Sequence, residues 1–174
     1  GLSQKAGPVV SDVRIAHGAR AGSSRVGAGQ ADLLLAFDLL VASSWTGLDA
    51  TDPDRTAVVG STDLVPPGAQ TSHPEIDMPS ADDLLRRIDA GTREDRRHWA
   101  DAAAVCLDLV GDLVGANIFV VGMAVQTGLL PISPASIEAA IELNGVAVEM
   151  NLAAFRWGRW QIADPELVLS LIHI

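Results

Sequence analysis

The residues best suited to ligand chemistry lie at the start of the sequence, where Ser3, Gln4 and Lys5 supply a hydroxyl, an amide and a flexible cation. Gly7 and Pro8 follow them directly. Glycine tolerates positive φ and proline fixes its own φ at about −65°, so this stretch favours a tight loop. Such a loop could hold an anionic or carbonyl-bearing ligand. A purely structural or interface role for the same polar side chains fits the pattern equally well, because interface rims are polar.

This loop runs into a pattern typical of a β-strand, which would carry it at the end of a sheet. Apolar Val9, Val13 and Ile15 share one side of an extended chain with Ser11. The other side holds Val10, Asp12, Arg14 and Ala16. This period of two predicts a half-buried strand over residues 9–16.

Further strands are expected along the first two-thirds of the chain. Residues 31–37 (ADLLLAF) and 56–61 (TAVVGS) are apolar runs of strand length, although periodicity alone fits a helix over 31–37 as well. A third short strand is expected within residues 99–104, leading into a helix that Gly115 ends. The glycine-rich residues 17–30 before these strands are expected to form a loop.

Helices are expected between the strands. Asp38 is suited to cap a short helix within residues 39–50, and Ser80 is suited to cap a second helix that ends at Gly91. Residues 63–79 contain four prolines and are expected to form a long extended loop or lid. Strands that alternate with helices in this way indicate a largely parallel sheet.

The last third of the chain is expected to be helical. Residues 117–126 form an apolar helix candidate whose small residues, including Gly122, would let another helix approach closely. Ser133 and Pro134 favour a new helix start, and a further helix is expected over about 146–159. The chain is therefore predicted to be an α/β protein, a three-layer α/β/α arrangement with a largely parallel sheet and a helical C-terminal part.

Composition excludes several classes of protein. The net charge of −10 argues against nucleic-acid binding, which needs clustered Lys and Arg. The longest apolar run, residues 118–125, is too short to cross a bilayer core of about 30 Å. The single cysteine, Cys106, provides no internal disulfide and no cluster-binding set. Because only one cysteine is present, a cytoplasmic setting is expected. His17, His73 and His98 lack metal-ligand spacing, so no metal is assigned.

Five other residues are candidates for contact with partner domains: Arg14, Asn117, Asn151, Trp157 and Arg159. Arg14 lies on the expected first strand, where pairing with a neighbouring carboxylate is the simpler role. The two asparagines lie in apolar helical surroundings, where a buried amide capping a loop or helix end is favoured. Tryptophan and arginine are enriched at interface hot spots, although core packing explains the tryptophans equally well.

Four segments in the same order resemble a known family. They are residues 1–16 (GLSQKAGPVVSDVRIA), 31–43 (ADLLLAFDLLVAS), 116–133 (ANIFVVGMAVQTGLLPIS) and 141–159 (IELNGVAVEMNLAAFRWGR). They look like the gamma domain of 2-oxoacid:ferredoxin oxidoreductases, and most like the fused-chain indolepyruvate ferredoxin oxidoreductases. Family members commonly show two glycines after the Gln-Lys pair, where this sequence has Ala6 and then Gly7.

The resemblance implies a division of labour within a larger enzyme. Such enzymes decarboxylate a 2-oxoacid on thiamine diphosphate with Mg²⁺, pass electrons through [4Fe-4S] clusters to ferredoxin, and transfer the acyl group to coenzyme A. The cofactors are expected in thiamine-binding and ferredoxin-like partner domains and none on this chain alone. The chain would act only within an oligomer, with indolepyruvate or another aryl pyruvate as substrate. Ser3, Gln4, Lys5 and Gly7 would then form part of the active-site wall.

The resemblance also bears on the limits of the domain. The family usually has a preceding glycine-rich strand-turn-helix unit, so residues 1–163 are expected to be a fragment of a gamma-type catalytic domain. Residues 164–174 have no assigned role, and residues 169–174 (LSLIHI) look like a translated sequencing adaptor. Two alternatives stay open: a stand-alone nucleotide-binding domain that uses residues 1–8 as an anion cradle, and a non-enzymatic scaffold.

Overall fold

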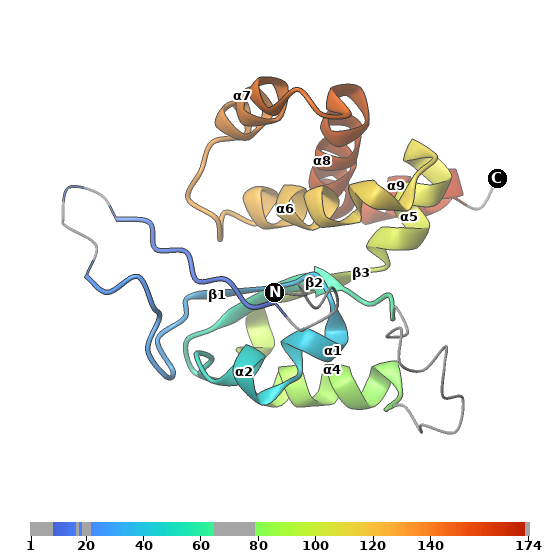
Figure 1. Ribbon diagram of the computed structural model, residues 1–174. Helices are drawn as coiled ribbons and strands as arrows, with labels where there is room; N and C mark the ends of the chain where they lie inside the picture. Colours follow the sequence, from blue (N-terminus) through green and yellow to red (C-terminus); the bar gives the residue numbers. More distant parts are fainter. Residues whose placement is uncertain (1–8, 17, 19–21, 65–78, 173–174) are drawn as a thin grey trace, which may run out of the picture.

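A three-stranded parallel sheet forms the middle layer of the protein (Figure 1). The structure, a computed structural model, describes residues 9–16, 18, 22–64 and 79–172. The strands are β1 (Leu33–Ala36), β2 (Ala57–Ser61) and β3 (Arg97–Ala100), in the order β1-β2-β3. Leu35 lies opposite Val59, and Gly60 lies opposite Trp99. The strands predicted from the two apolar runs are confirmed.

The central strand is packed too tightly to carry a side chain at every position. All five residues of β2 are buried. A Cβ on Gly60 would lie 2.6 Å from the Cβ of Ala36 and 2.7 Å from its carbonyl oxygen. Glycine therefore allows β1, β2 and the Trp99 ring to lie close together at this level of the sheet.

Three helices cover one face of the sheet (Figure 1). They are α1 (Leu39–Ala42), α2 (Trp45–Leu48) and α4 (Ala81–Ala90), and the core that they share with β1 and β2 includes Leu39, Val58, Leu84 and Ile88. Asp38 and Ser80 are the N-caps of α1 and α4, as predicted. The single helix expected within 39–50 is instead two helices, because Ser44 caps a new start by accepting a hydrogen bond from the Gly47 amide.

The other face is covered by a layer of helices that continues to the end of the described chain. These helices are α5 (Ala102–Val110), α6 (Ala116–Gln126), α7 (Pro134–Asn144), α8 (Val148–Ala163) and α9 (Pro165–Ile172), with 3₁₀ turns at Glu94–Arg96 and Leu113–Gly115. The predicted three-layer α/β/α fold is confirmed. The helix after β3 ends earlier than predicted, because Gly111 takes a left-handed φ of 84° directly after Val110. None of the described helices is both long and apolar enough to cross a bilayer.

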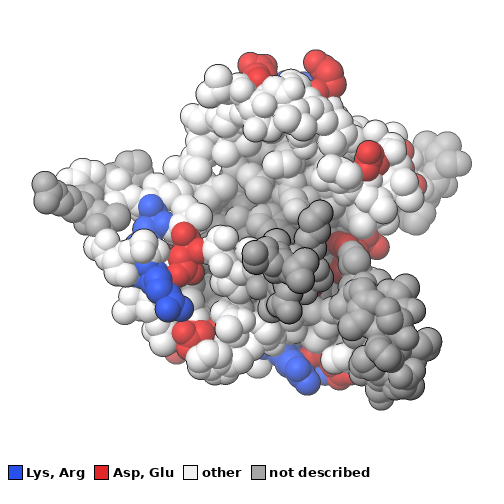
Figure 2. Space-filling view, viewed as in Figure 1, with Lys and Arg blue, Asp and Glu red and all other residues white. Residues whose placement is uncertain are grey.

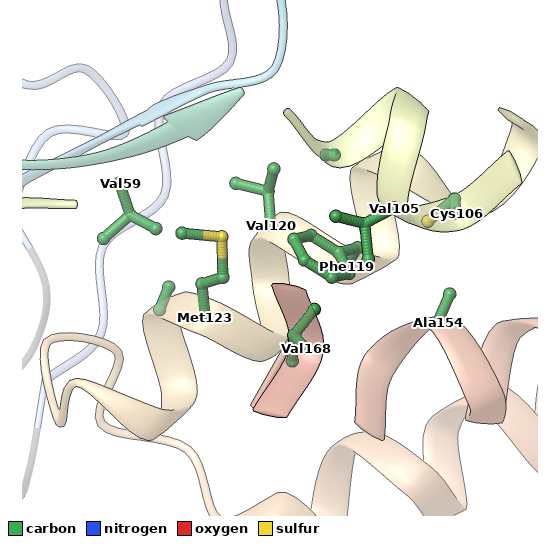
Figure 3. Close-up of a cluster of buried hydrophobic side chains, with 10 residues drawn as sticks. Val59, Val105, Cys106, Phe119, Val120, Met123, Ala154 and Val168 are labelled. Atoms are coloured by element: carbon green, nitrogen blue, oxygen red, sulfur yellow. The ribbon is translucent and has the colours of Figure 1, made fainter. Parts of the chain in front are cut away.

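The larger core lies between the sheet and this second helical layer (Figure 3). Val59 of β2 meets Phe119, Val120 and Met123 of α6 there. Val168 of α9 is fully buried in the same cluster. Residues beyond 163, to which no role was assigned, therefore include part of the hydrophobic core.

Helices α6 and α8 cross at a pair of glycines. A Cβ on Gly122 would overlap the carbonyl oxygen of Phe155, and a Cβ on Gly158 would overlap the carbonyl oxygen of Phe119. Each helix thus presents its glycine to the backbone of the other, and both phenylalanine side chains are fully buried. The prediction that small residues near Gly122 allow a close helix approach is confirmed.

The strand predicted over residues 9–16 is wrong. These residues form no regular strand, and every one of them is exposed. Their side chains instead reach a neighbouring segment: the Val26 amide donates to Oδ2 of Asp12 (3.1 Å), and Nη2 of Arg14 donates to the carbonyl of Arg25 (2.8 Å). The alternation of apolar and polar residues favours a strand only where a neighbouring strand can pair with it. Within the described chain, no strand lies beside residues 9–16.

Candidate functional site

The predicted ligand loop cannot be placed, because Ser3, Gln4, Lys5 and Gly7 lie outside the described residues. The same holds for most of the predicted 63–79 loop. The described residues nevertheless show the carboxyl edge of the sheet, where the strands end. In open α/β sheets ligands usually bind at this edge. The side chains at the carboxyl edge therefore show which kinds of ligand it could help to bind.

Ser61, the last residue of β2, is the centre of the polar contacts at this edge. Its hydroxyl donates to the carboxylate of Asp63 and accepts from the amide of Ala102 at 3.0 Å. The Thr62 amide donates to the Ala100 carbonyl at 2.9 Å. Ser61 is only 2% exposed, so it acts as a structural link between the end of β2 and the start of α5.

Acidic side chains occupy the helix starts at the same edge. Asp38 accepts from the Leu40 amide at 2.8 Å, and Asp101 accepts from the Ala104 amide at 2.9 Å. Asp82 and Asp83 lie in the first turn of α4. A helix start attracts phosphate through unpaired amides and a positive dipole end, and these carboxylates offset both. The described part of this edge is therefore poorly suited to a nucleotide phosphate.

Burial shifts the pKa of two titratable side chains near the sheet toward the uncharged form. Cys106 is fully buried, and burial, with a smaller contribution from the Asp63 carboxylate, raises the pKa of its thiol to about 11. Burial also lowers the pKa of His98 on β3. A thiol with that pKa stays protonated at neutral pH, so Cys106 is a core residue, as predicted, and not a nucleophile.

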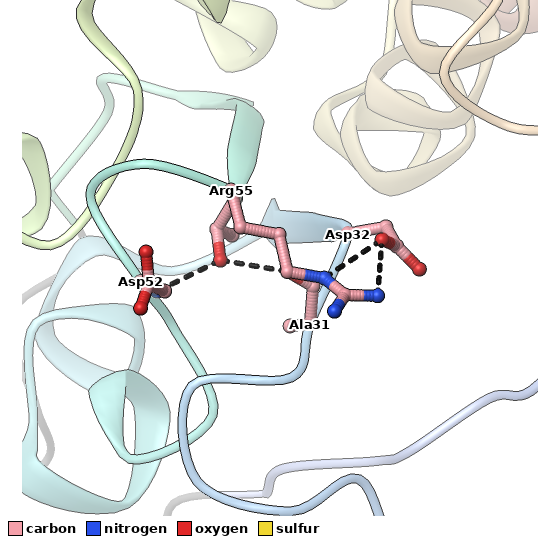
Figure 4. A network of polar contacts seen from close by, with 5 residues as sticks. Ala31, Asp32, Asp52 and Arg55 are labelled. Carbon is pink, nitrogen blue, oxygen red and sulfur yellow. Dashed lines mark hydrogen bonds and ion pairs between the residues drawn. The ribbon is translucent and has the colours of Figure 1, made fainter.

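The opposite, amino edge of the sheet holds a second polar network (Figure 4). Nε of Arg55 donates to Oδ1 of Asp32 at 2.9 Å. The Thr56 hydroxyl donates to the Ala31 carbonyl at 2.7 Å and accepts from the Asp52 amide at 2.9 Å. These contacts join the segments that enter β1 and β2, so their role is structural.

A groove on the helical layer is the second candidate site. We call it the Arg groove; it has a volume of about 390 Å³. Its lining residues are Gln126, Glu138, Arg156, Arg159, Trp160 and Ala163, from α6, α7 and α8. Nε of Arg156 donates to Oε1 of Glu138 at 2.9 Å, and Nε of Arg159 donates to Oε1 of Gln126 at 3.0 Å. The Arg156 hydrogen bond lowers the pKa of Glu138, and the Glu138 hydrogen bond raises the pKa of Arg156.

The predicted interface residues separate into groups. Arg159 lines the Arg groove together with Trp160, which is 48% exposed, whereas Trp157 packs against the larger core. Asn151 is half-buried rather than fully buried, and its amide donates to the Val146 carbonyl at 3.0 Å. Asn117 is exposed on α6, so its predicted burial is wrong; its position in an apolar stretch did not reveal the side that faces solvent.

Arg14 also differs from its expected setting. It does not lie on a strand, and its guanidinium bonds a backbone carbonyl. Figure 2 shows acidic and basic side chains together at the left of the molecule, and further acidic side chains at the top and at the right of the helical layer. The sequence singled out Arg159 of the Arg groove as an interface candidate but did not reveal the groove itself. The two linked Phe-x-x-Gly stretches were also missed, although residues 119–122 (FVVG) and 155–158 (FRWG) repeat the same pattern.

A comparison with protein families assigns the chain to a family. The sequence model described as pyruvate ferredoxin/flavodoxin oxidoreductase matches residues 1–160. The chain belongs to this family. No match was found among curated proteins or among solved structures. Pyruvate ferredoxin/flavodoxin oxidoreductases use thiamine diphosphate and iron–sulfur clusters in general, and they are oxidoreductases of the 2-oxoacid:ferredoxin type.

The residues of this family member do not fit those cofactors. A [4Fe-4S] cluster takes four cysteine thiolates, and the chain has one cysteine, which is buried. Thiamine diphosphate is held through its pyrophosphate and a divalent cation. Among residues 9–64 and 79–172, as far as the structure describes them, no group of three acidic, histidine or cysteine side chains could hold a metal. The chain therefore lacks the four thiolates of a [4Fe-4S] cluster, and its described residues hold no such acidic, histidine or cysteine group for a metal.

Proposed function

We propose that this chain is the gamma-type domain of a thiamine-diphosphate-dependent 2-oxoacid:ferredoxin oxidoreductase. The observation that carries this proposal is the family match over residues 1–160. The enzyme would convert a 2-oxoacid to an acyl-CoA with electrons passed to ferredoxin. Indolepyruvate or another aryl pyruvate is the proposed substrate, on the resemblance to fused-chain indolepyruvate enzymes.

The proposed role of the chain is to complete a site whose cofactors belong to other domains. Its partners would be the thiamine-binding and ferredoxin-like domains of the same enzyme. The single cysteine supports this division, because a [4Fe-4S] cluster needs four thiolates, as does the acidic carboxyl edge of the described residues, which is poorly suited to phosphate. Thiamine diphosphate would supply the electron sink for decarboxylation when bound in its own domain.

Within that site, residues 3–5 are proposed to position the substrate. The Lys5 ammonium would pair with the substrate carboxylate, and the Ser3 hydroxyl and the Gln4 amide would orient its carbonyl. Gly7 would let the loop backbone approach closely. A charge-assisted contact of this kind lowers the barrier only if it is held in place before reaction, which is the role proposed for the remainder of the domain.

Reconstitution with the thiamine-binding and cluster-binding partners tests the proposal. The complete enzyme should reduce ferredoxin with a 2-oxoacid and coenzyme A, and a comparison of pyruvate with indolepyruvate should show the higher kcat/KM for indolepyruvate. Lys5→Ala should lower kcat/KM by about 100-fold. Lys5→Arg should restore part of it, and Arg25→Ala, an exposed cation outside the loop, should leave it unchanged.

Three results would contradict specific parts of the proposal. Equal kcat/KM in Lys5→Ala and the wild type would remove the loop from the active site while leaving the family role intact. A preference for pyruvate would remove the aryl specificity. Tight binding of an ADP-containing nucleotide by the chain alone, without 2-oxoacid oxidation in the reconstituted mixture, would favour the nucleotide-binding alternative.

A further inference from the structure

The Arg groove lies in the helical layer above the sheet, where α6, α7 and α8 meet (Figure 1). Four of its lining residues lie at helical positions i, i+3, i+4 and i+7 of α8, which share one side of a helix: Arg156, Arg159, Trp160 and Ala163. Gln126 of α6 and Glu138 of α7 complete the lining. The volume of about 390 Å³ is within the range of small-molecule sites and exceeds what a simple inorganic anion fills.

Arg159 is the cation of the groove that is placed to meet a ligand. Arg156 is paired with Glu138, whereas none of the ion pairs between described residues includes Arg159. Arg159 is half-buried, and its Nε donates to the neutral Gln126 amide at 3.0 Å. The terminal nitrogens of its guanidinium carry further N–H donors, whose planar fork matches a carboxylate. The groove therefore contains an oriented donor for an anion.

The charge of the groove suits an anion with a single negative charge. Its lining holds two guanidinium groups and one carboxylate, that of Glu138. Two carboxylates outside the lining, Glu142 and Glu149, also act on Arg156 and raise its pKa. These acidic neighbours repel a doubly charged anion more strongly than a singly charged one. A carboxylate is therefore favoured over a phosphate monoester, which carries nearly two charges at neutral pH.

Trp160 adds an apolar surface beside this donor. It is 48% exposed, it directly follows Arg159, and Ala163 lies three residues further along the same helix. An indole ring offers a large apolar face and packs favourably against another aromatic ring. A carboxylate that carries an aromatic ring would thus use both kinds of surface in the groove, the polar fork and the apolar face.

We propose that the Arg groove binds a small aromatic monocarboxylate. Its carboxylate pairs with the terminal N–H groups of Arg159, and its ring packs on Trp160. Arg156 keeps its contact with Glu138, so binding does not break the link between α8 and α7. The proposal does not depend on the enzymatic role proposed above, because it uses only side chains of the helical layer.

Titration of the complete chain with benzoate tests the proposal, followed by nuclear magnetic resonance of the indole N–H groups. The Trp160 signal should shift and saturate, whereas the signal of Trp45, which is 79% exposed on α2, should stay in place. The variants Trp160→Phe and Trp45→Phe assign the two signals. Benzamide lacks the charge, acetate lacks the ring, and phenyl phosphate carries additional charge, so each should bind at least about tenfold more weakly than benzoate.

Variants of Arg159 identify the residue that holds the carboxylate. Arg159→Gln should weaken benzoate binding by about tenfold or more, because the charge-assisted hydrogen bonds are lost. Arg159→Lys keeps the charge without the fork, so its affinity should lie between those of the wild type and Arg159→Gln. Arg87→Gln removes an exposed cation from α4, on the other face of the sheet, and should bind benzoate like the wild type.

Several results would overturn the proposal. They are the absence of saturable binding, equal affinity for benzamide or acetate, tighter binding of phenyl phosphate, and wild-type affinity in a folded Arg159→Gln variant. The same titration of the enzyme reconstituted with its partner domains distinguishes a ligand site from a contact between domains. Binding should persist there, and its loss on assembly would overturn the proposal by assigning the groove to a partner domain. None of these results depends on oxidation of a 2-oxoacid.

Discussion

At the scale of single residues, the charged contact inside the Arg groove is the pair formed by Arg156 and Glu138. The two side chains come from α8 and α7, and the pair is open to water, with exposed fractions of 56% and 27%. Water screens such a pair, so its value for stability is small. Its position matters more, because it fixes one of the two guanidinium groups that line the groove.

This pair predicts a specific dependence of stability on pH. The pKa of Glu138 is lowered in the folded protein, so its contribution is present above the ordinary value of 4.5 and is lost as the pH falls through the lower folded pKa. Glu138→Gln should therefore lower Tm by about 1 °C at neutral pH. The difference from the wild type should vanish in acid. Thermal unfolding of both proteins across this pH range measures it, and a difference that grows in acid would contradict the assignment.

The two tryptophans of α8 show where sequence reasoning stops at this scale. Trp157 and Trp160 are three residues apart and lie close together on the helix. Nonetheless the first packs on the core and the second lines the groove. The rotation of α8 about its own axis determines which tryptophan faces the core. The glycine contacts with α6 set that rotation, and such tertiary contacts cannot be read from the sequence of α8 alone.

At the scale of elements, local signals predicted most of the helices and strands. Apolar runs gave β1 and β2, and the N-caps Ser80 and Ser133 marked two helix starts. Failures occurred where a local preference met a tertiary requirement. Residues 9–16 alternate like a strand but have no neighbouring strand among the described residues. The predicted ligand loop was identified only by its residue types, and it lies outside the described residues.

The α6–α8 crossing is the element-scale contact most sensitive to substitution. Gly158→Ala would drive a methyl group into the Phe119 carbonyl, which belongs to a helix backbone and cannot turn aside. We expect a loss of about 3 kcal/mol in the free energy of unfolding, because overpacking forces the two helices apart. Urea unfolding measures this loss. Gly22→Ala, with nothing within 4 Å of the added carbon, should change the stability by less than about 0.5 kcal/mol. Equal stability of the two variants would show that the crossing is looser than described.

At the scale of the whole molecule, the core does not end where the family match ends. The match stops at residue 160, whereas α8 continues to Ala163 and α9 places Val168 among residues of α5 and α6. The helical layer above the sheet is therefore closed by residues to which the sequence assigned no role. The sequence could not predict the burial of α9, because that burial depends on the direction in which α8 runs before it.

Val168 provides a test of this whole-molecule packing. Val168→Ala should lower the free energy of unfolding by about 2 kcal/mol, because it leaves a cavity between α9 and the rest of the core. Leu169→Ala removes a larger but half-exposed side chain from the same helix and should cost less. Chemical denaturation of both variants gives the comparison. If Val168→Ala unfolds like the wild type, α9 is not part of the cooperative unit.

The reciprocal glycines of α6 and α8 have one more consequence, for the spacing of the Arg groove. Moving either helix by one residue along the other would bring a side chain to a place that only a glycine fits. The glycines therefore allow only one register between α6 and α8. Gln126 lies one turn beyond Gly122, and Arg159 directly follows Gly158. The contact between the two helix backbones therefore fixes the separation of these two groove residues, which a hydrogen bond of 3.0 Å already joins.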